Sequence, residues 1–472
     1  MSASRKKTIW NFAENLEGDK VIWMIVMFLI FSSIVCIFSS SSRLLEDGQT
    51  RLDIVGDQVL TVIFGLALIV GLYNIRNLKF FRWCSKWGFL VSVVFLVLLD
   101  IHVRLPFMRA IEINGAWRIL KIAGFQVHVF EIVKVAMVMY MAWAVEKVKK
   151  GPCPLLDSLK DNPKLKFLSG KKARKWIYLY LPFIVVFLMV LPGSNSSALF
   201  IAGIMFLTIL IGGGEWKEMA KIAAIGVGLL AVCTGLYFIS SGKIFKRIGT
   251  GITRIVSDNS DYEKMVIESK PGSREYQLAL DKIHQPYSAK IAVKQGGLIG
   301  RGAGQSRQRY IVPDMSEDYM YSFIIEEYGL LGGIFILTLY VSLMARGVLI
   351  VRNCGQELFP KCAIAGLCLL ITGQAFLHML VNVDIGPMTG QTLPLISHGN
   401  SAFLCFSIAF GIILAISRIA SRKMASEQKN AKSLVELHET VQGLDDLEAF
   451  ENGSSVEDEA VELQNIDNEY DL

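Results

Sequence analysis

Apolar runs long enough to cross a lipid bilayer recur from one end of this 472-residue chain to the other. A hydrocarbon core about 30 Å thick requires roughly 20 apolar residues in a helix, and only helices and closed barrels satisfy all their backbone hydrogen bonds there. The composition agrees, because 53% of the residues are hydrophobic and 19% are charged, against about 25% charged in soluble domains. The sequence therefore predicts an all-α, polytopic membrane protein.

We expect about ten transmembrane helices, with a long extracytoplasmic loop between the seventh and the eighth. They cover about residues 21–40, 58–74, 87–101, 127–145, 176–191, 197–212, 222–240, 319–344, 362–383 and 400–418. The chain then divides into an N-terminal segment (1–20), a transmembrane domain (21–425) that contains the loop 241–318, and a tail (426–472). No cleavable signal peptide is expected, because no small-residue cleavage site follows the first apolar run.

The distribution of basic residues orients these helices. With the N-terminus in the cytoplasm, the cytoplasmic segments hold 28 Lys and Arg residues and the short outside loops hold 6. Short loops rich in Lys and Arg stay on the cytoplasmic side of a membrane. We therefore expect a multi-pass protein of the cytoplasmic membrane with both termini in the cytoplasm. The long loop carries 13 Lys and Arg residues, but segments of that length cross regardless of charge.

The formal net charge of +6 conceals an acidic C-terminal segment. From Glu436 to Leu472 the chain has 13 Asp and Glu residues and no Lys or Arg. Such a composition, with few aromatic residues, is typical of disordered chains. We expect a disordered cytoplasmic tail that either keeps the C-terminus soluble or docks a partner.

Cysteine and histidine residues indicate no disulfide framework and no zinc site. All eight cysteines are predicted to lie in membrane helices or cytoplasmic loops, where structural disulfides are not expected. No Cys or His residues have zinc-ligand spacing. His128, His378 and His398 are isolated in sequence, so we interpret them as packed, hydrogen-bonded core residues.

Charged residues inside the predicted spans are functional candidates, because ionisable groups are costly at membrane depth. Glu131 and Lys134 lie three residues apart in the fourth span, where they share a helix face and can pair. At about 1.5 Å per residue, Lys134 and Glu326 both lie roughly 12 Å below the outer surface, so we expect them in one layer of the membrane. The alternative is a self-satisfied structural ion pair.

Five carboxylates crowd the entry to the eighth span, in "VPDMSEDYMYSFIIEEYG": Asp314, Glu317, Asp318, Glu326 and Glu327. Helical geometry places Glu326 near the side of Asp318 and Glu327 on the opposite side. We interpret Glu326 and Glu327 as a structural ion cluster. Asp318 alone is expected at the boundary between water and membrane, where it can meet both a lipid headgroup and water.

Two irregular segments flank this entry. Gly300, Gly302 and Gly304 imitate part of a nucleotide-binding fingerprint, but no βαβ unit surrounds them, so we interpret them as flexible or closely packed backbone. Pro387 and Pro394 break the chain between the ninth and tenth spans. Non-helical backbone at membrane depth is tolerated where it lines a cavity, so this segment is predicted to form a cavity wall.

Several segments resemble the signature of the FtsW/RodA/SpoVE family, the SEDS proteins. They are "NGAWR" (114–118), the Glu131–Lys134 pair, the run 290–333 and "PMTGQTLPLISHGNS" (387–401). The resemblance covers about residues 15–420, and the first span and the acidic tail look more like the FtsW branch. It implies a peptidoglycan glycosyltransferase that polymerises lipid II into glycan strands on the outer face of the cytoplasmic membrane during cell division.

The resemblance also implies roles for individual residues. The essential aspartate of the family falls on Asp318, which we interpret as the general base that deprotonates the attacking sugar hydroxyl. Glu131, Lys134 and Ser397 fall on polar cavity positions, and Arg118 belongs to the matching "NGAWR" motif. These four residues are expected to bind substrate.

The departing undecaprenyl pyrophosphate needs its charge stabilised. Candidate contacts are the basic residues near the end of the long loop, namely Lys290, Lys294, Arg301, Arg307 and Arg309. A divalent cation such as Mg or Mn could share this task, although the sequence contains no dedicated set of metal ligands. No other cofactor is expected.

The resemblance implies three kinds of protein partner or surface: the lipid bilayer, a class B penicillin-binding protein (an FtsI-like transpeptidase), and other divisome membrane proteins at the division septum. No nucleic acid is expected. Two alternative functions are a flippase for a lipid-linked precursor and a non-catalytic scaffold that recruits a transpeptidase. A flippase needs charges through the full depth of the membrane. Here they are predicted to cluster in the outer half, which favours chemistry at the outer face.

Overall fold

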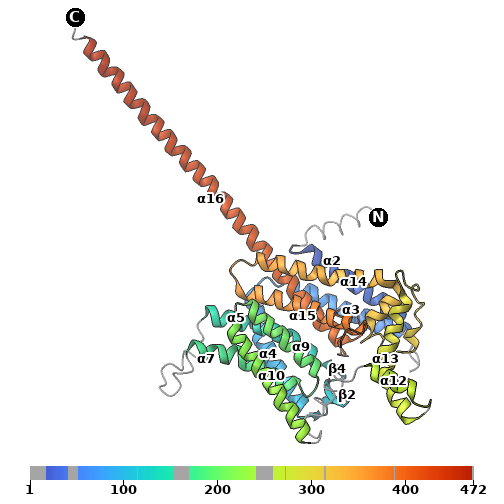
Figure 1. Cartoon of the computed structure of the whole chain (residues 1–472). Helices are drawn as coiled ribbons and strands as arrows, with labels where there is room; N and C mark the ends of the chain where they lie inside the picture. Colours follow the sequence, from blue (N-terminus) through green and yellow to red (C-terminus); the bar gives the residue numbers. More distant parts are fainter. Residues whose placement is uncertain are drawn as a thin grey trace. The chain divides into compact units, whose positions relative to one another are not determined.

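The computed structural model describes residues 17–40, 51–113, 115–151, 170–240, 259–271, 273–312, 315–386 and 389–469. Most of them are helical (Figure 1). The first helices are α2 (Lys20–Ser40), α3 (Arg51–Tyr73), α4 (Leu78–Asp100) and α5 (Val129–Lys150). They are followed by α7 (Lys171–Lys175), the π-helix η4 (Trp176–Tyr180), α8 (Leu181–Val190), α9 (Asn195–Ile211) and α10 (Trp216–Ile239).

The C-terminal part begins with two helices of the predicted outside loop, α12 (Asn259–Glu268) and α13 (Arg274–Gly296). A short 3-10 helix, η5 (Gln308–Tyr310), precedes the long helices. These are α14 (Met320–Asn353), α15 (Leu358–Asn382) and α16 (Asn400–Glu469).

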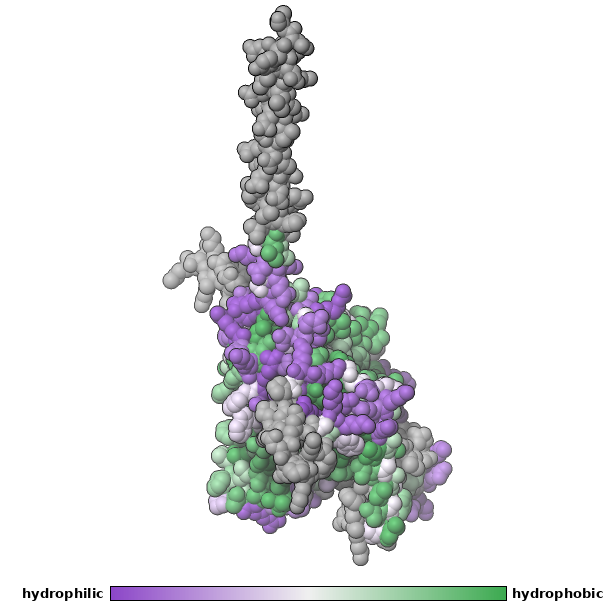
Figure 2. All heavy atoms as spheres, turned by 90° about the vertical axis from the view of Figure 1, so that its left-hand side faces the viewer, coloured by the Kyte–Doolittle hydropathy of each residue, from purple (hydrophilic) through white to green (hydrophobic). Residues whose placement is uncertain are grey.

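The predicted polytopic helical architecture is confirmed. Eight helical stretches of the described chain are long and apolar enough to cross a membrane, and they match eight of the ten predicted spans. Of the other two, α9 is a shorter apolar helix of 17 residues, and α5 is a helix of 22 residues that carries Glu131 and Lys134. Figure 2 shows broad hydrophobic patches on one face beside a hydrophilic zone, as expected where lipid replaces water.

The helix α4 shows why the predicted spans were too short. It begins at Leu78, about nine residues before the predicted span, and includes Arg82. The guanidinium of Arg82 is paired with Glu146 at 2.7 Å and with Glu357 at 2.9 Å. Because Glu146 and Glu357 compensate this charge, α4 can include Arg82, which lies before the start of the predicted span at about residue 87.

A small four-stranded antiparallel sheet between α4 and α5 was not predicted and is a minor addition to the helical architecture. Its strands lie in chain order: β1 (Arg104–Leu105), β2 (Met108–Ile113), β3 (Ala116–Ile122) and β4 (Phe125–His128). The β3–β4 turn consists of Ala123 and Gly124, with φ angles of 49° and 94°. Two positive φ angles are typical of the tight hairpin turn that matches strand twist. The strand β3 packs against α4 and α5.

The helix α15 lies at the centre of the bundle, in contact with α5, α9 and α14 (Figure 1). Its core face includes Leu367, Ile371 and Ala375, all fully buried. Close van der Waals packing of this kind holds membrane helices together, because lipid tails are as apolar as the side chains. The same face also carries polar residues, which form the site described below.

The helix α14 is interrupted at Gly329, which has a φ of 72° and a ψ of −175°. Backbone from the segment after α13 fills the interruption. The amide of Arg301 donates to Glu326 O at 2.9 Å, and the amide of Leu330 donates to Gly297 O at 2.9 Å. The peptide groups that the break would leave unpaired are therefore satisfied by another segment.

Glycine makes this backbone contact possible. A Cβ on Gly296 would lie 2.0 Å from Ile325 O, and one on Gly300 would lie 2.3 Å from Glu327 O. The close approach considered for the glycine run is thus present at Gly300. Gly302 and Gly304 have positive φ angles but no such contact.

The helix α16 continues to Glu469, so the tail that we expected to be disordered is helical through most of its length. Residues 420–450 are rich in Ala, Leu, Lys, Glu and Gln, which are strong helix formers. The chain divides into two compact units, Met1–Ile419 and Ala420–Leu472. All features discussed below belong to the first unit.

Candidate active site

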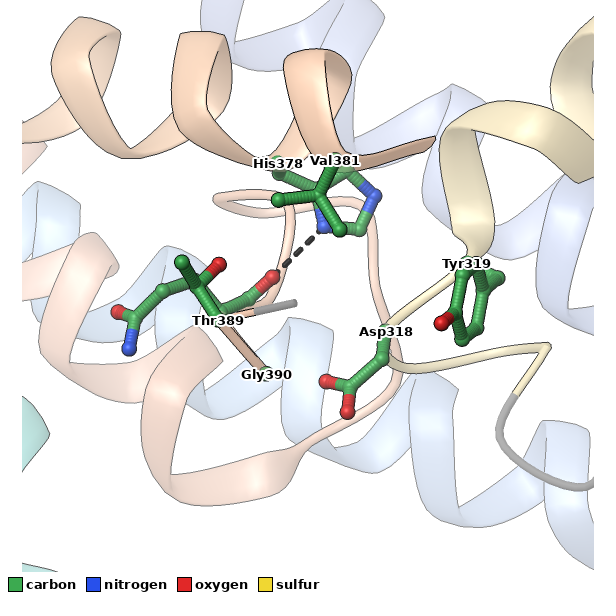
Figure 3. Close-up of a pocket in the computed structure, with 7 residues that line it drawn as sticks. Asp318, Tyr319, His378, Val381, Thr389 and Gly390 are labelled. Carbon is green, nitrogen blue, oxygen red and sulfur yellow. Dashed lines mark hydrogen bonds between the residues drawn. The ribbon is translucent and has the colours of Figure 1, made fainter. Parts of the chain in front are cut away.

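Asp318 lies in the turn immediately before α14 and lines a small pocket. The helix begins at Met320, so Asp318 precedes it by two residues instead of opening it. The pocket residues are Asp318, Tyr319, His378, Val381, Thr389, Gly390 and Gln391 (Figure 3). In Figure 3 the carboxylate of Asp318 points toward Gly390, while the ring of Tyr319 lies on the other side of the turn. Asp318 is half-buried, so part of the residue remains open to solvent.

The end of α15 fixes the backbone of this turn. The side-chain amide of Asn382 donates to Asp318 O at 3.0 Å and to His378 O at 2.8 Å. Its Oδ1 accepts from the amide of Ser322 at 2.9 Å. One buried side chain therefore holds both the turn and the first turn of α14 against α15.

His378 adds a second link between the same elements. Its Nε2 accepts from the amide of Tyr321 at 3.3 Å, so Nδ1 carries the proton and donates to Gln391 O at 2.7 Å (Figure 3). The expectation of a hydrogen-bonded core histidine is confirmed for His378. It is wrong for His128, which is exposed, and His398 is partly exposed, near the carboxylate of Glu317.

Ser397 supports the turn from the segment between α15 and α16. Its hydroxyl donates to Glu317 O at 2.7 Å and accepts from the amide of Leu393 at 2.9 Å. The residue is buried. The hydroxyl that we expected to face a cavity is thus engaged with the backbone beside Asp318. Asp314 and Pro387 lie outside the described residues.

Lys134 is fully buried and is surrounded by three oxygen acceptors. Its Nζ lies 2.6 Å from Glu131 Oε1, 2.6 Å from Gln374 Oε1 and 2.8 Å from Gln391 Oε1. The expected ion pair with Glu131 is present. An ammonium group has three N–H donors, and all three are engaged here. The other carboxylate oxygen, Glu131 Oε2, is buried without a partner among the described residues.

The two glutamines extend this cluster toward Asp318. The amide of Gln374 donates to Thr392 O at 2.9 Å, and that of Gln391 donates to Ser197 Oγ at 3.1 Å. A continuous polar network therefore runs from α5 through α15 to the segment 389–397, which forms one wall of the Asp318 pocket. Sequence reasoning missed both glutamines and Asn382, because uncharged amides inside apolar runs give no charge signal.

Glu326 and Glu327 form a separate buried cluster with the segment between α13 and α14. Glu326 accepts from Ser306 Oγ at 2.5 Å and from the amide of Arg307 at 2.9 Å. Glu327 accepts from Ser39 Oγ at 2.6 Å and from the amide of Ser306 at 3.4 Å. Since both carboxylates contact Ser306, they do not point in opposite directions. The predicted directions of Glu326 and Glu327 relative to Asp318 assumed that Asp318 belongs to the helix, but α14 begins only at Met320.

The basic residues of the predicted outside loop differ in whether they form ion pairs or hydrogen bonds with other described residues. Arg309 is buried, with Nη1 2.9 Å from Ser39 O and 3.7 Å from the carboxylate of Glu327. Lys290 pairs with Asp384 at 2.6 Å. These two side chains hold the loop to the helices.

Arg301 is partly exposed and lies 2.5 Å from Gln295 and 3.7 Å from Glu326. Lys294 and Arg307 are exposed, and neither side chain has a partner within the described residues. Arg118 donates to Gly193 O at 3.2 Å, which links β3 to the start of α9. In the described part of the chain, no group of three His, Cys, Asp or Glu side chains is placed to hold a metal ion.

Comparison with known sequences connects this geometry to a family. The FtsW/RodA/SpoVE sequence model, described as a cell cycle protein, matches residues 19–422. A relative from Caulobacter vibrioides, named probable peptidoglycan glycosyltransferase FtsW, is 27% identical over 329 residues, which cover 69% of this chain and 71% of the relative. A relative of the same name from Lactococcus lactis is 27% identical over 416 residues, covering 86% and 94%.

Solved structures show the same fold. A chain from work on the structural coordination of polymerization and crosslinking by a peptidoglycan synthase complex has a TM-score of 0.57 and 19% identity, and covers 85% of this chain and 98% of its own length. The rod shape determining protein RodA of Thermus thermophilus has a TM-score of 0.50 and 18% identity, and covers 86% and 98%.

Proposed function

Because this chain belongs to the FtsW/RodA/SpoVE family of cell cycle proteins, we propose that it is a peptidoglycan glycosyltransferase that polymerises lipid II into glycan strands on the outer face of the cytoplasmic membrane during cell division. Relatives that match most of this chain are named for that activity. The observation that carries the proposal is the pocket at Asp318, where a half-buried carboxylate stands on a turn fixed by α15 and by the 389–397 segment.

Asp318 acts as the general base of the transfer. A hydroxyl of the acceptor sugar attacks the anomeric carbon of the donor, the bond from that carbon to the pyrophosphate oxygen breaks, and Asp318 accepts the hydroxyl proton. General bases work when they are held within hydrogen-bond reach of that proton. The contacts of Asn382 and Ser397 go to the backbone of the turn, so they orient the aspartate without using its side chain.

The Lys134 cluster positions one wall of the pocket. Its ammonium charge is compensated by Glu131 and its donors are engaged, so Lys134 contributes through Gln391 instead of by direct contact with a phosphate. Glu131 Oε2 remains as an acceptor for a substrate hydroxyl or amide. The fully engaged ammonium group of Lys134 orders the segment around Gln391.

Lys294 and Arg307 are the cations proposed to stabilise the departing pyrophosphate. Both are exposed and unpaired within the described chain, whereas Lys290 and Arg309 neutralise carboxylates. Lys294 lies one helical turn beyond Lys290 on the same face of α13, and Lys290 contacts Asp384 just after α15. This contact directs that face of α13 toward the end of α15, where Asn382 contacts the Asp318 turn.

A membrane-bound class B penicillin-binding protein is the proposed partner, because such a protein would supply the crosslinking activity. The structural relative comes from a peptidoglycan synthase complex that coordinates polymerization and crosslinking. We further propose that both termini are cytoplasmic, that other divisome membrane proteins bind the chain, and that it acts at the division septum. The predicted cytoplasmic segments hold 28 Lys and Arg residues and the predicted short outside loops hold 6, which supports this orientation.

The test is polymerisation of purified lipid II by the full-length protein together with its transpeptidase partner. Wild type should produce glycan strands, and Asp318→Asn should produce none while retaining partner binding and thermal stability. Glu317→Gln, in the neighbouring exposed carboxylate, is the matched control and should retain most activity. Polymerisation by Asp318→Asn at the wild-type rate would exclude the general-base role.

Absence of polymerisation by wild type, with transbilayer movement of lipid II in vesicles, would favour the flippase alternative. Absence of both would favour the scaffold.

A further inference from the structure

A line of basic residues crosses the sheet between α4 and α5. The strand register pairs Arg104 with Arg109, Arg109 with Lys121, and Lys121 with Gln126. Directly opposed residues of antiparallel strands lie on the same face, with Cβ atoms about 4.5–5.5 Å apart. These four residues therefore form one line across β1–β4. We call its three cations, Arg104, Arg109 and Lys121, the basic row.

The basic row has no compensating charge in the described part of the chain. All three side chains are exposed, and none is paired with a described carboxylate. Like charges directly opposite each other destabilise a sheet. Three in line therefore cost folding free energy unless an anion lies over them, which indicates a binding surface.

Exposed aromatic residues lie at the end of the sheet next to the basic row. Phe107 in the β1–β2 turn is 66% exposed, and Phe125 after the β3–β4 turn is 77% exposed. The amide of Ala123 donates to Phe107 O at 2.9 Å, so the two turns lie side by side. Because Phe125 directly precedes Gln126, its side chain points to the opposite face of β4, and the two phenylalanines form an apolar end beside the basic row. Apolar side chains next to basic residues are typical of surfaces that bind the membrane interface.

The sheet is attached to membrane helices at both ends. The strand β1 begins four residues after α4 ends at Asp100, and β4 runs directly into α5 at Val129. Gln126, at the end of the line, is three residues before Val129, which is about 10 Å along an extended chain. This distance keeps the basic row at the level of lipid headgroups.

We propose that the basic row binds the phosphates of anionic phospholipids, while Phe107 and Phe125 insert among the adjacent acyl chains. Charge complementarity calls for an anion, and the exposed aromatic tip together with the short connections to α4 and α5 favours a lipid over an acidic protein. This surface is separate from the Asp318 pocket and from the cations assigned to pyrophosphate.

The experiment titrates purified full-length protein in detergent with phosphatidylglycerol or phosphatidylcholine and counts bound lipids by native mass spectrometry. One variant removes the basic row with Arg104→Gln, Arg109→Gln and Lys121→Gln. The matched control removes three exposed charges elsewhere in the outside segment with Lys264→Gln, Lys270→Gln and Arg274→Gln. A basic residue near an anionic surface contributes about fivefold in affinity, so the first variant should weaken phosphatidylglycerol binding by about a hundredfold. Phosphatidylcholine binding and the control should stay near wild type.

A charge-preserving variant separates binding from folding. Arg104→Lys with Arg109→Lys and Lys121→Arg should keep phosphatidylglycerol binding, because the charges remain in register. Unchanged phosphatidylglycerol binding in the glutamine variant would overturn the proposal, and so would an equal loss in the control. Unchanged lipid binding with lost binding of polyglutamate would assign the row to an acidic protein and would equally overturn it.

Discussion

The side-chain amide of Asn382 donates a hydrogen bond to the backbone oxygen of Asp318, with 3.0 Å between the two atoms. The other end of the same amide group accepts from Ser322 in the first turn of α14. The position of the proposed catalytic base therefore depends on a residue at the end of another helix, 64 positions away in the chain.

Replacing this amide should slow catalysis without abolishing it. Loss of a hydrogen bond worth about 1.4 kcal/mol corresponds to a tenfold change, so Asn382→Ala is expected to lower kcat for lipid II polymerisation at least about tenfold with little change in KM. Steady-state kinetics with purified lipid II measure this. Asn353→Ala, at the exposed far end of α14, is the control and should behave as wild type. A change confined to KM would contradict the positioning role.

The Lys134 cluster predicts a non-additive pair of substitutions. Lys134→Met leaves the mostly buried carboxylate of Glu131 uncompensated, which costs up to about 3–5 kcal/mol, the value for a fully buried pair. The double variant Glu131→Gln with Lys134→Met removes both charges and should recover part of that loss. Thermal unfolding of the two single variants and the double variant in lipid nanodiscs gives the coupling free energy between Glu131 and Lys134. Strictly additive losses would show that the two charges do not stabilise each other.

Substitutions of the basic residues in the predicted outside loop should fall into two groups, those that lower catalytic efficiency and those that lower stability. Arg307→Gln and Lys294→Gln are expected to weaken transition-state stabilisation, since a hydrogen bond to a charged group contributes about 1.5–3 kcal/mol, roughly a tenfold to a hundredfold loss of kcat/KM each. Arg309→Gln should instead lower the unfolding temperature, because it removes contacts to Ser39 and leaves Glu327 less compensated. Kinetics and unfolding curves for the same three proteins test this. Normal kcat/KM in Arg307→Gln and Lys294→Gln would remove both from the pyrophosphate site.

The backbone contact between α13 and α14 should tolerate no side chain. A Cβ on Gly296 would lie 2.0 Å from Ile325 O, so Gly296→Ala must displace backbone and is expected to prevent accumulation of folded protein. Gly228→Ala is the control, because a Cβ there meets no atom within 4 Å and alanine favours a helix. Yield after size-exclusion chromatography compares the two. Equal yields would show that the contact can relax.

Orientation in the membrane can be read by accessibility. Single cysteines introduced into a cysteine-free background at Ser260 and Ser454 should differ: an impermeant thiol reagent applied to intact cells should label the first and not the second. Labelling of Ser454→Cys in intact cells, with Ser260→Cys protected, would reverse the proposed orientation and place Asp318 on the wrong side for lipid II polymerisation.

The membrane helices were predictable because hydrophobicity is a local signal. The lengths of these helices were not predictable, because charged residues such as Arg82 are paired with carboxylates that are distant in sequence. The sheet between α4 and α5 was missed although its signals were present: Ala123 and Gly124 form a tight turn, and an Asn-Gly pair stands at 114–115. A short sheet between two membrane helices has no hydrophobic run that would draw attention to it.

The candidate site was partly predictable. Glu131 and Lys134 carry charge where charge is costly, so they could be found in the sequence. Asp318 was singled out by its position at the entry to the eighth span and by the family resemblance, in which the essential aspartate falls on it. Asn382, Gln374 and Gln391 could not, since each is an ordinary polar residue until the fold brings it to a charged partner. The depth argument, which placed Lys134 and Glu326 in one layer of the membrane, could not decide whether Lys134 pairs with Glu131 or with a carboxylate of the eighth span. Equal depth does not imply contact, and the described partners of Glu326 lie in the outside loop.

The interruption of α14 at Gly329 has a consequence for how the protein is made. A membrane helix normally enters the bilayer with its own hydrogen bonds complete. Here residues around Glu326 and Leu330 are completed by Gly297 and Arg301, which belong to a segment synthesised earlier. That segment is therefore available to pair with α14 when α14 leaves the ribosome. The order of translation thus supplies the hydrogen-bonding segment 297–301 before the interrupted helix α14. A circular permutation that reversed this order would make α14 insert while the peptide groups at its interruption lack partners.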